Sequence, residues 1–144
     1  MEIAEIKLSY SSGITEFERV YDSASMYGVL LLKWDLDTIE LQEEFKVVFL
    51  NNGNGIIGIY NHSKGSSAST VVDTRIICSV ALKCNATYMV LAHNHPSDNL
   101  KPSKTDIKLT EKLKEAAKLF DIHVIDHLII SKNGYYSFSE AGFV

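Results

Sequence analysis

Two histidines and an aspartate have the residue types and the spacing of a metal-binding site. His93 and His95 stand two residues apart at the end of the apolar run 86–92. Side chains two residues apart in an extended chain leave the same face of the strand, so both imidazoles point toward one place. Asp106 follows in the first turn of a predicted helix and can add a carboxylate oxygen. Two histidines and one carboxylate, with a fourth position open to water, form the ligand set of a catalytic zinc ion.

Each part of this pattern also has a purely structural explanation. A single His-x-His pair is common in proteins. Ser103 stands three residues before Asp106 and can cap the helix, while Asp106 occupies the first turn, where a negative charge is favoured. Pro96 and Pro102 are ordinary loop residues. The combination is more specific than its parts, because a strand ending in His-x-His-Pro is joined by a short loop to a helix that starts with Ser-x-x-Asp.

The elements that must position these residues alternate between strand and helix patterns. Composition and turn signals predict strands at residues 45–50, 56–60, 86–92, 123–130 and 135–138. Helical periodicity and capping residues predict helices at about residues 22–34 and 73–83, and a third helix that begins after Ser103 and has its apolar stripe at residues 109–120. The uninterrupted apolar run 86–92 is typical of a central strand covered on both faces. This order predicts one α/β domain in which helices pack against a mixed sheet.

Composition limits the classes of protein to which the chain can belong. Its 144 residues fit one domain, and 46% hydrophobic and 22% charged residues are ordinary for a soluble protein. The net charge of -4 provides no global basic field for nucleic acid. The first five residues lack the pattern of a signal peptide, and no apolar run approaches the roughly 20 residues of a membrane helix. Cys78 and Cys84 suggest no disulfide framework. We therefore expect a cytoplasmic protein with no membrane segment.

The motif His93-x-His95-Pro96, followed after six residues by Ser103-x-x-Asp106, resembles the JAMM motif of MPN-type (JAB) metallohydrolases. The chain is similar to the bacterial RadC branch of that family over about residues 40–144. The matching phrases are residues 91–97, 101–103, 106–107, 126–129 and 136–138. The resemblance implies a three-layer MPN/JAMM fold, with a curved mixed sheet flanked by helices in a layout related to the cytidine deaminases. It divides the chain into an N-terminal extension with a short helix, residues 1–40, and a RadC-like domain, residues 41–144.

The resemblance also implies a catalytic glutamate on an early strand. Glu43 and Glu44 both precede Phe45, and strand alternation places the two carboxylates on opposite faces. The Glu-x-Phe pattern of RadC-like sequences selects Glu43 as the general base that deprotonates the zinc-activated water and later protonates the leaving group. Ser103 would help to hold the oxyanion. The alternative for whichever glutamate points outward is a solvated charge at the start of a strand.

Three further residues near the motif are assigned other roles. Asp126 and His127 match a family phrase, and we expect a structural pair or indirect support of the site rather than direct contact with the metal. Asp98 stands where the family often has glycine, which leaves the shape of this loop open.

Three functions compete at this point. The first is a zinc-dependent hydrolase, with one Zn²⁺ per chain, that acts as a metallopeptidase or isopeptidase on a peptide or protein. The second is a factor that acts on or near nucleic acid, because RadC-type proteins carry a DNA-repair label. The helix-hairpin-helix segment often found ahead of the RadC domain is not evident in residues 1–40, and acidic residues interrupt the lysines of residues 101–114. The third is a non-catalytic metal-binding scaffold.

A deaminase is disfavoured because its His-x-Glu and Pro-Cys-x-x-Cys motifs are missing. The substrate and the oligomeric state stay open.

Overall fold

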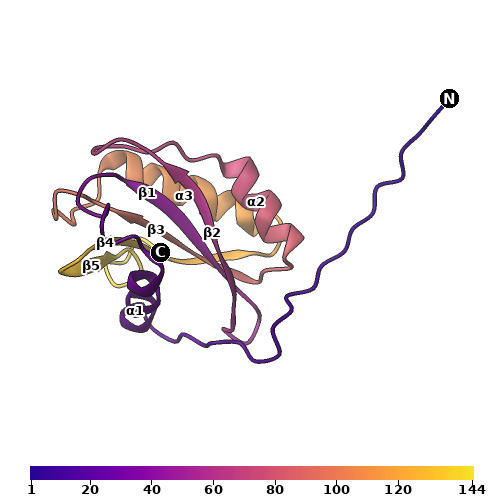
Figure 1. Cartoon of the computed structure of the whole chain (residues 1–144), viewed down its shortest axis with the longest axis horizontal. Helices are drawn as coiled ribbons and strands as arrows, with labels where there is room; N and C mark the ends of the chain where they lie inside the picture. Colours follow the sequence, from indigo (N-terminus) through magenta and orange to yellow (C-terminus); the bar gives the residue numbers. More distant parts are fainter.

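A five-stranded mixed sheet forms the centre of the computed structural model, which describes residues 1–144 (Figure 1). The strands are β1 (Glu44–Leu50), β2 (Ile56–Lys64), β3 (Tyr88–Asn94), β4 (His123–Ser131) and β5 (Gly134–Ser137), in the spatial order β2-β1-β3-β4-β5. β3 and β4 run parallel, and the other neighbouring pairs are antiparallel. Helices α2 (Thr74–Lys83) and α3 (Lys104–Lys118) cover one face of the sheet, and α1 (Ser23–Lys33) covers the other. The predicted α/β architecture of a mixed sheet between helices is confirmed.

The two central strands, β1 and β3, are buried on both faces. All seven residues of β1 are buried, as are all residues of β3 except the first. Alternate side chains enter two separate cores: Val47 and Leu91 pack beneath α2 and α3, whereas Val48 and Val90 pack against the α1 side. Burial on both faces explains why these segments are apolar over most of their length. The strand ends that carry the motif residues therefore project from strands that are buried on both faces.

The helices begin where the sequence predicts them. Asp22 caps α1 and accepts a hydrogen bond from the backbone N of Ser25, and Ser103 caps α3 in the same way through Asp106. α3 starts at Lys104, five residues before Leu109, which is the first residue of the predicted apolar stripe. The stripe begins later than the helix because the first turn is polar. β2 is longer than predicted and continues to Lys64, since its backbone keeps pairing with β1 where the side chains become polar.

The first forty residues form two parts, one that extends away from the domain and one that packs on it. The segment before residue 15 has no helix or strand and extends away from the domain (Figure 1). From Arg19, which pairs with Gly55 in an isolated antiparallel bridge, the chain packs on the sheet. The buried residues that this part adds to the core are Val20, Met26, Tyr27, Leu30, Trp34 and Ile39. None of the three helices has the combination of length and apolar character that would allow it to cross a membrane.

Candidate metal and hydrolytic site

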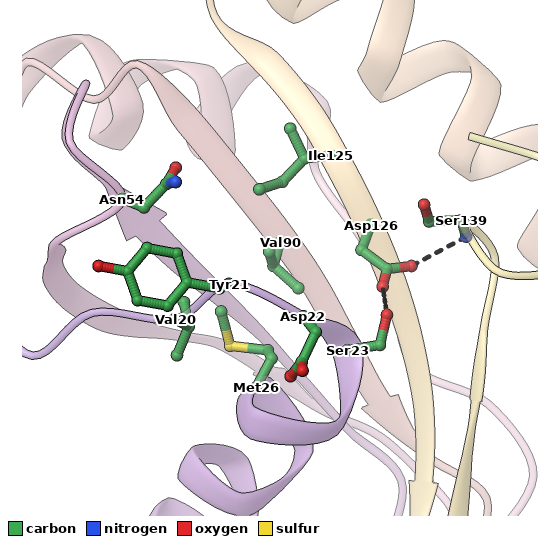
Figure 2. Close-up of a pocket in the computed structure, with 10 residues that line it drawn as sticks. All are labelled: Val20, Tyr21, Asp22, Ser23, Met26, Asn54, Val90, Ile125, Asp126 and Ser139. Atoms are coloured by element: carbon green, nitrogen blue, oxygen red, sulfur yellow. Dashed lines mark hydrogen bonds between the residues drawn. The ribbon is translucent and has the colours of Figure 1, made fainter.

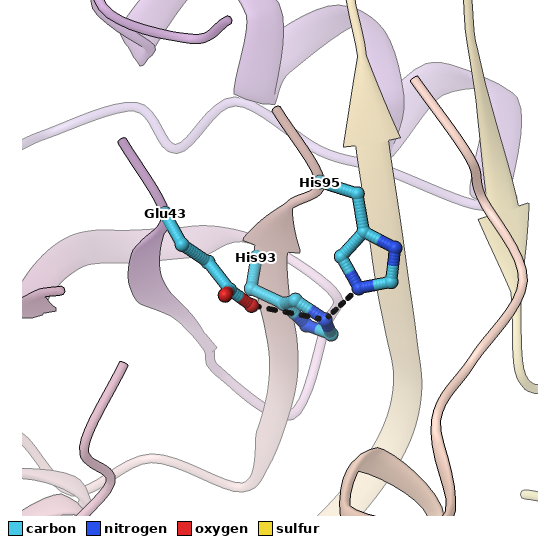
Figure 3. Close-up of side chains that lie close together, drawn as sticks. All are labelled: Glu43, His93 and His95. Carbon is cyan, nitrogen blue, oxygen red and sulfur yellow. Dashed lines mark hydrogen bonds and ion pairs between the residues drawn. The ribbon is translucent and has the colours of Figure 1, made fainter. Parts of the chain in front are cut away.

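Three elements meet at the candidate site. β3 carries His93 near its end, and His95 lies just beyond the strand. Phe45 of β1 pairs with His93, which places Glu43, two residues earlier, beside the end of β3. α3 carries Asp106 in its first turn. Figure 3 shows the side chains of Glu43 and the two histidines pointing toward one another from the beginning of β1 and the end of β3.

The polar atoms of these residues lie close together. The two Nε2 atoms of His93 and His95 are 3.0 Å apart. The Asp106 carboxylate reaches both rings, with Oδ1 at 3.4 Å from Nε2 of His93 and Oδ2 at 3.5 Å from Nε2 of His95. Glu43 places Oε1 at 3.8 Å from Nε2 of His93. Glu43, His93 and His95 each offer an atom within 4.8 Å of the others, and these residues could hold a metal ion. The structure therefore brings the three predicted ligands and the predicted base to one place.

The separations of these atoms are close to those between ligands of one metal ion. Zinc binds nitrogen and oxygen ligands at about 2.0–2.2 Å, so two ligands at the corners of a tetrahedron lie about 3.3–3.6 Å apart. The two Asp106 distances, 3.4 and 3.5 Å, lie in this range and join different oxygens of the carboxylate to the two rings, whereas the distance of 3.0 Å between the two Nε2 atoms is shorter. Nδ1 of His95 lies 2.6 Å from the carbonyl oxygen of Asn99, which can only accept a hydrogen bond. The proton of the neutral His95 ring is therefore on Nδ1, and its Nε2 offers a lone pair to the site.

Burial and hydrogen bonds shift the pKa values of the two carboxyl groups in opposite directions. Burial raises the pKa of Glu43 above its ordinary value, despite the nearby histidines. Burial also opposes the charge of Asp106, but hydrogen bonds that His93 and His95 donate when their rings are protonated, together with the one from the backbone N of Ser103, outweigh that effect and hold the pKa of Asp106 well below its usual range. Asp106 therefore keeps its negative charge, whereas Glu43 has the greater affinity for a proton.

A family model described as a RadC-like JAB domain matches residues 20–143. The chain belongs to the RadC-like JAB domain family. This finding confirms the resemblance drawn from the motif, and the match begins near Val20, where the chain starts to pack on the sheet.

Curated relatives of this RadC-like domain carry the name UPF0758 protein. The protein from Flavobacterium johnsoniae is 46% identical over 100 residues, which is 69% of this chain and 44% of that protein. A protein from Clostridium botulinum is 42% identical over 103 residues, 72% of this chain and 45% of its own length. The protein from Salinibacter ruber is 43% identical over 123 residues, 85% of this chain and 50% of its own. The chain thus spans about half the length of these relatives, whose names state no activity.

The two adjacent glutamates of the RadC-like domain face different surroundings. Glu43 is 6% exposed and lies beside the histidines. Glu44 points the other way, where its Oε1 lies 3.2 Å from Nζ of Lys64 and its Oε2 lies 3.9 Å from Nζ of Lys46. The alternation of an extended chain separates the two carboxylates. Glu43 is therefore the one close enough to exchange a proton with a group held at the histidines.

Ser103 of the RadC-like domain has a structural role that also serves the site. Its Oγ accepts a hydrogen bond from the backbone N of Asp106 at 3.0 Å, and its backbone N donates to Oδ2 of Asp106 at 2.8 Å. This capping box satisfies the helix terminus and holds the Asp106 carboxylate in one orientation. The hydroxyl group of Ser103 donates to no acceptor in the chain and lines the cavity beside the site, so its proton is available to a further oxygen.

Cavities lie on two sides of the histidines. One of about 290 Å³ is lined by Glu43, His93, Ser103 and Asp106 together with part of the loop 65–73 between β2 and α2. The other, of about 350 Å³, is lined by His95, Pro96 and Asp98 and by residues 131–133 at the turn between β4 and β5. The site therefore has open space both toward the start of α3 and toward the β4–β5 turn.

Asp126 and His127 of the RadC-like domain project from opposite faces of β4. Asp126 lines a cavity of about 250 Å³ on the α1 side (Figure 2). Its carboxylate accepts hydrogen bonds from Oγ of Ser23 at 2.7 Å and from the backbone N of Ser139 at 3.0 Å. His127 faces the opposite side, where its Nε2 lies 2.7 Å from Nδ1 of His93. Asp126 thus links α1 and the C-terminal segment to β4, while His127 contacts His93, a candidate metal ligand.

Two residues near the site have roles that we did not predict from the sequence. Asn94, which lies between the two histidines, is fully buried and bonds to the backbone on both sides of Glu43. Thr110, one turn after Asp106, is buried and bonds to His127. In each case the sequence contains a signal, because a polar residue stands within a pattern of buried positions. The signal does not identify the residue to which the polar side chain forms its hydrogen bond.

Residue 98, in the loop after the histidines, has a backbone conformation that suits glycine. Asp98 has a φ of 66°, in the left-handed region that favours glycine and that aspartate and asparagine tolerate best among other residues. Its Oδ2 accepts a hydrogen bond from Nδ2 of Asn133 at 3.1 Å. The loop therefore keeps a turn suited to glycine and gains a contact with the β4–β5 turn.

Proposed function

We propose that this chain is a zinc-dependent hydrolase of the JAMM type, a metallopeptidase or isopeptidase that acts on a peptide or protein. The observation that carries the proposal is the convergence of the ring nitrogens of His93 and His95 on the Asp106 carboxylate, beside the buried Glu43. Membership in the RadC-like JAB domain family supports the same chemistry.

His93, His95 and Asp106 would hold one zinc ion per chain. Asp106 is preferred to Glu43 as the third ligand because its oxygens lie 3.4 and 3.5 Å from the two rings, whereas Glu43 lies 3.8 Å from His93. Imidazole and carboxylate groups are ordinary zinc ligands. When bound, zinc polarises a carbonyl group and lowers the pKa of a water molecule to about 7.

Glu43 would act first as the general base and then as the general acid. Its carboxylate lines the same cavity as His93 and Asp106, where a water molecule and a substrate carbonyl have room. Burial raises its pKa, which brings its proton affinity closer to the value that suits proton transfer near neutral pH. Glu43 would take a proton from the attacking water and deliver it to the leaving amine. Ser103 would donate its hydroxyl proton to the charge that develops on the substrate carbonyl oxygen.

Metal analysis tests the basis of this proposal. Protein purified without chelator should contain about one zinc ion per chain, and His95→Ala and Asp106→Ala should each lose it while keeping the folded circular dichroism spectrum. His123→Ala is the matched control, because His123 is an exposed histidine at the other end of the sheet. Wild-type protein without stoichiometric divalent metal at neutral pH would contradict the proposed site.

Activity assays separate the proposed reaction from its alternatives. Glu43→Gln should retain zinc but lose cleavage of the responsive member of a peptide and ubiquitin-like fusion library, and Glu44→Gln should keep cleavage. Full activity in Glu43→Gln would remove this residue from the mechanism. Metal-dependent cutting of an oligonucleotide, rather than of any peptide, would favour the nucleic-acid alternative. Zinc binding with no cleavage of either class would favour a scaffold.

A further inference from the structure

A chain of buried hydrogen bonds runs behind His93, on the side of the ring away from His95. Nδ1 of His93 lies 2.7 Å from Nε2 of His127, and Nδ1 of His127 lies 2.6 Å from Oγ1 of Thr110. Oγ1 of Thr110 lies 2.8 Å from the backbone carbonyl oxygen of Asp106. His93 and Thr110 are no more than 2% exposed, and His127 is fully buried. The chain therefore starts at one candidate ligand and ends on the backbone of another.

The direction of these hydrogen bonds is set at the Asp106 end. A carbonyl oxygen can only accept, so the one hydroxyl proton of Thr110 is used there. Oγ1 of Thr110 must then accept a hydrogen bond from Nδ1 of His127. His127 stacks on Phe138 and forms no ion pair with a carboxylate, and full burial in such surroundings favours the neutral ring. A neutral His127 with a proton on Nδ1 has a lone pair on Nε2.

That lone pair determines the tautomer of His93. Nε2 of His127 can accept a hydrogen bond only if Nδ1 of His93 carries a proton. In the neutral form of the His93 ring, Nε2 is then unprotonated, and it is the atom that lies 3.0 Å from His95 and 3.4 Å from Asp106. His95 reaches the same tautomer by a different route, through the carbonyl oxygen of Asn99. Both rings therefore present lone pairs to the same point.

We propose that His127 and Thr110 are positioning residues, which hold His93 as the Nδ1–H tautomer and so present its Nε2 atom to a metal ion. The inference rests on the proposed metal site. Ligating histidines commonly donate their second N–H to a carboxylate, a backbone carbonyl or a water molecule. Here the acceptor is a neutral imidazole, which fixes the tautomer without adding a third negative charge to a site that already contains Glu43 and Asp106.

Substitutions of Thr110 test the proposal with little change in volume. Thr110→Val keeps the shape but leaves Nδ1 of His127 without an acceptor, so His127 can move its proton to Nε2 and no longer accept from His93. We expect zinc affinity, measured by competition with a chromogenic chelator, to fall about 10- to 100-fold. Thr110→Ser restores the hydroxyl group and should return the affinity to within about threefold of the wild type, and His127→Phe should weaken binding as Thr110→Val does.

Nitrogen-15 NMR of the metal-free protein provides a readout that does not depend on zinc or on activity. Long-range couplings should show protonated Nδ1 and unprotonated Nε2 in both His93 and His127 of the wild type. In Thr110→Val the proton of His127 should move to Nε2, and that of His93 should follow. A core-packing role alone would leave the wild-type tautomer of His93 unconstrained and the zinc affinity of Thr110→Val unchanged, and either result overturns the proposal. If wild-type protein binds no zinc but has these tautomers, the proposed function fails while the hydrogen-bond chain stands.

Discussion

Single hydrogen bonds decide how Glu43 is placed relative to the histidines, and Asn94 makes three of them. Its Oδ1 accepts from the backbone N of Glu44 at 2.7 Å, and its Nδ2 donates to the carbonyl oxygens of Ile39 and Gln42 at 2.8 and 2.9 Å. Asn94 is fully buried on the side of β3 opposite to His93. Because these bonds join the end of β3 to the chain that enters β1, they set the distance from the Glu43 carboxylate to the ligands.

Asn94→Ala should therefore impair catalysis more than metal binding. The substitution leaves one backbone N–H and two carbonyl groups without their partner, and we expect the free energy of unfolding to fall by roughly 2–4 kcal/mol. Zinc content should stay near that of the wild type, while the rate of cleavage drops because Glu43 is less well held. Urea denaturation and metal analysis measure the two effects, with the exposed Asn52→Ala as control. Equal loss of zinc and activity would show that Asn94 supports the ligands instead.

His127 should make the stability of the metal-free protein depend on pH. Burial, together with the nearby His93, lowers the pKa of His127 well below its ordinary value of 6.5. Between these two values the unfolded chain binds more protons than the folded one, so His127 contributes stability that is present above about pH 6.5 and lost below it. Below pH 6.5 the contribution of His127 to the free energy of unfolding falls by up to about 1.4 kcal/mol for each pH unit. The raised pKa of His95 has the opposite effect, so the quantity to compare is the slope of unfolding free energy against pH in wild type and in His127→Phe. Identical slopes between pH 7.5 and 5.5 would contradict this assignment.

At the scale of elements, the start of α3 combines helix capping with orientation of Asp106, a proposed metal ligand. Ser103 and Asp106 exchange hydrogen bonds, so the same two side chains that satisfy the helix terminus fix the direction of the carboxylate. The negative charge of Asp106 also interacts favourably with the N-terminal end of the helix dipole. A role in stability and a role at the site are therefore compatible at these positions.

Ser103→Ala should lower both stability and metal affinity. Loss of the cap is expected to cost about 1 kcal/mol of unfolding free energy, because the backbone N–H of Asp106 loses its acceptor, and to loosen the first turn of α3, which carries the Asp106 carboxylate. Ser103→Thr keeps a capping hydroxyl and is the matched control. Thermal unfolding and zinc competition measure the two effects. A variant that keeps its stability and its affinity but loses activity would assign Ser103 to the substrate oxyanion alone.

The elements and the ligand motif could be predicted because their signals are local. The apolar run before His93 indicates a buried strand, and Ser103 with Asp106 indicates the start of a helix, each within a few residues. The contacts of Thr110 and Asn94 could not be predicted in the same way. Thr110 contacts His127 from 17 positions away, and Asn94 contacts Glu44 from 50 positions away, so both contacts depend on which helices and strands become neighbours. That order follows from packing of the whole chain rather than from any segment.

At the scale of the whole molecule, the sheet separates the side with the candidate metal site from a side that α1 covers. Two clusters of 12 buried residues lie on the two faces. The α1 side includes Met26, Tyr27, Leu30 and Trp34, and without them the inner face of the sheet would be open to water. Removal of this layer would expose apolar area on the strands that also carry the site.

Two truncations should therefore behave differently. A chain that starts at Thr15 loses residues that are largely exposed, and its unfolding midpoint should stay within about 2 °C of the full chain. A chain that starts at Asp35 lacks α1, and we expect it to lose its cooperative thermal transition and to bind a dye for exposed apolar surface. Circular dichroism during heating and dye fluorescence test both expectations. Cooperative unfolding of the shorter chain would show that α1 is dispensable for the core.

The convergence of His93, His95 and Asp106 should make the stability of the folded protein depend on the concentration of free metal. Lone pairs and a carboxylate 3.0–3.5 Å apart favour the folded chain most when a cation lies between them. By mass action, free zinc at a thousand times its dissociation constant would add about 4.1 kcal/mol to the unfolding free energy. If the proposed site holds zinc, the unfolding midpoint should rise with free zinc, and a strong chelator should lower it by removing the ion.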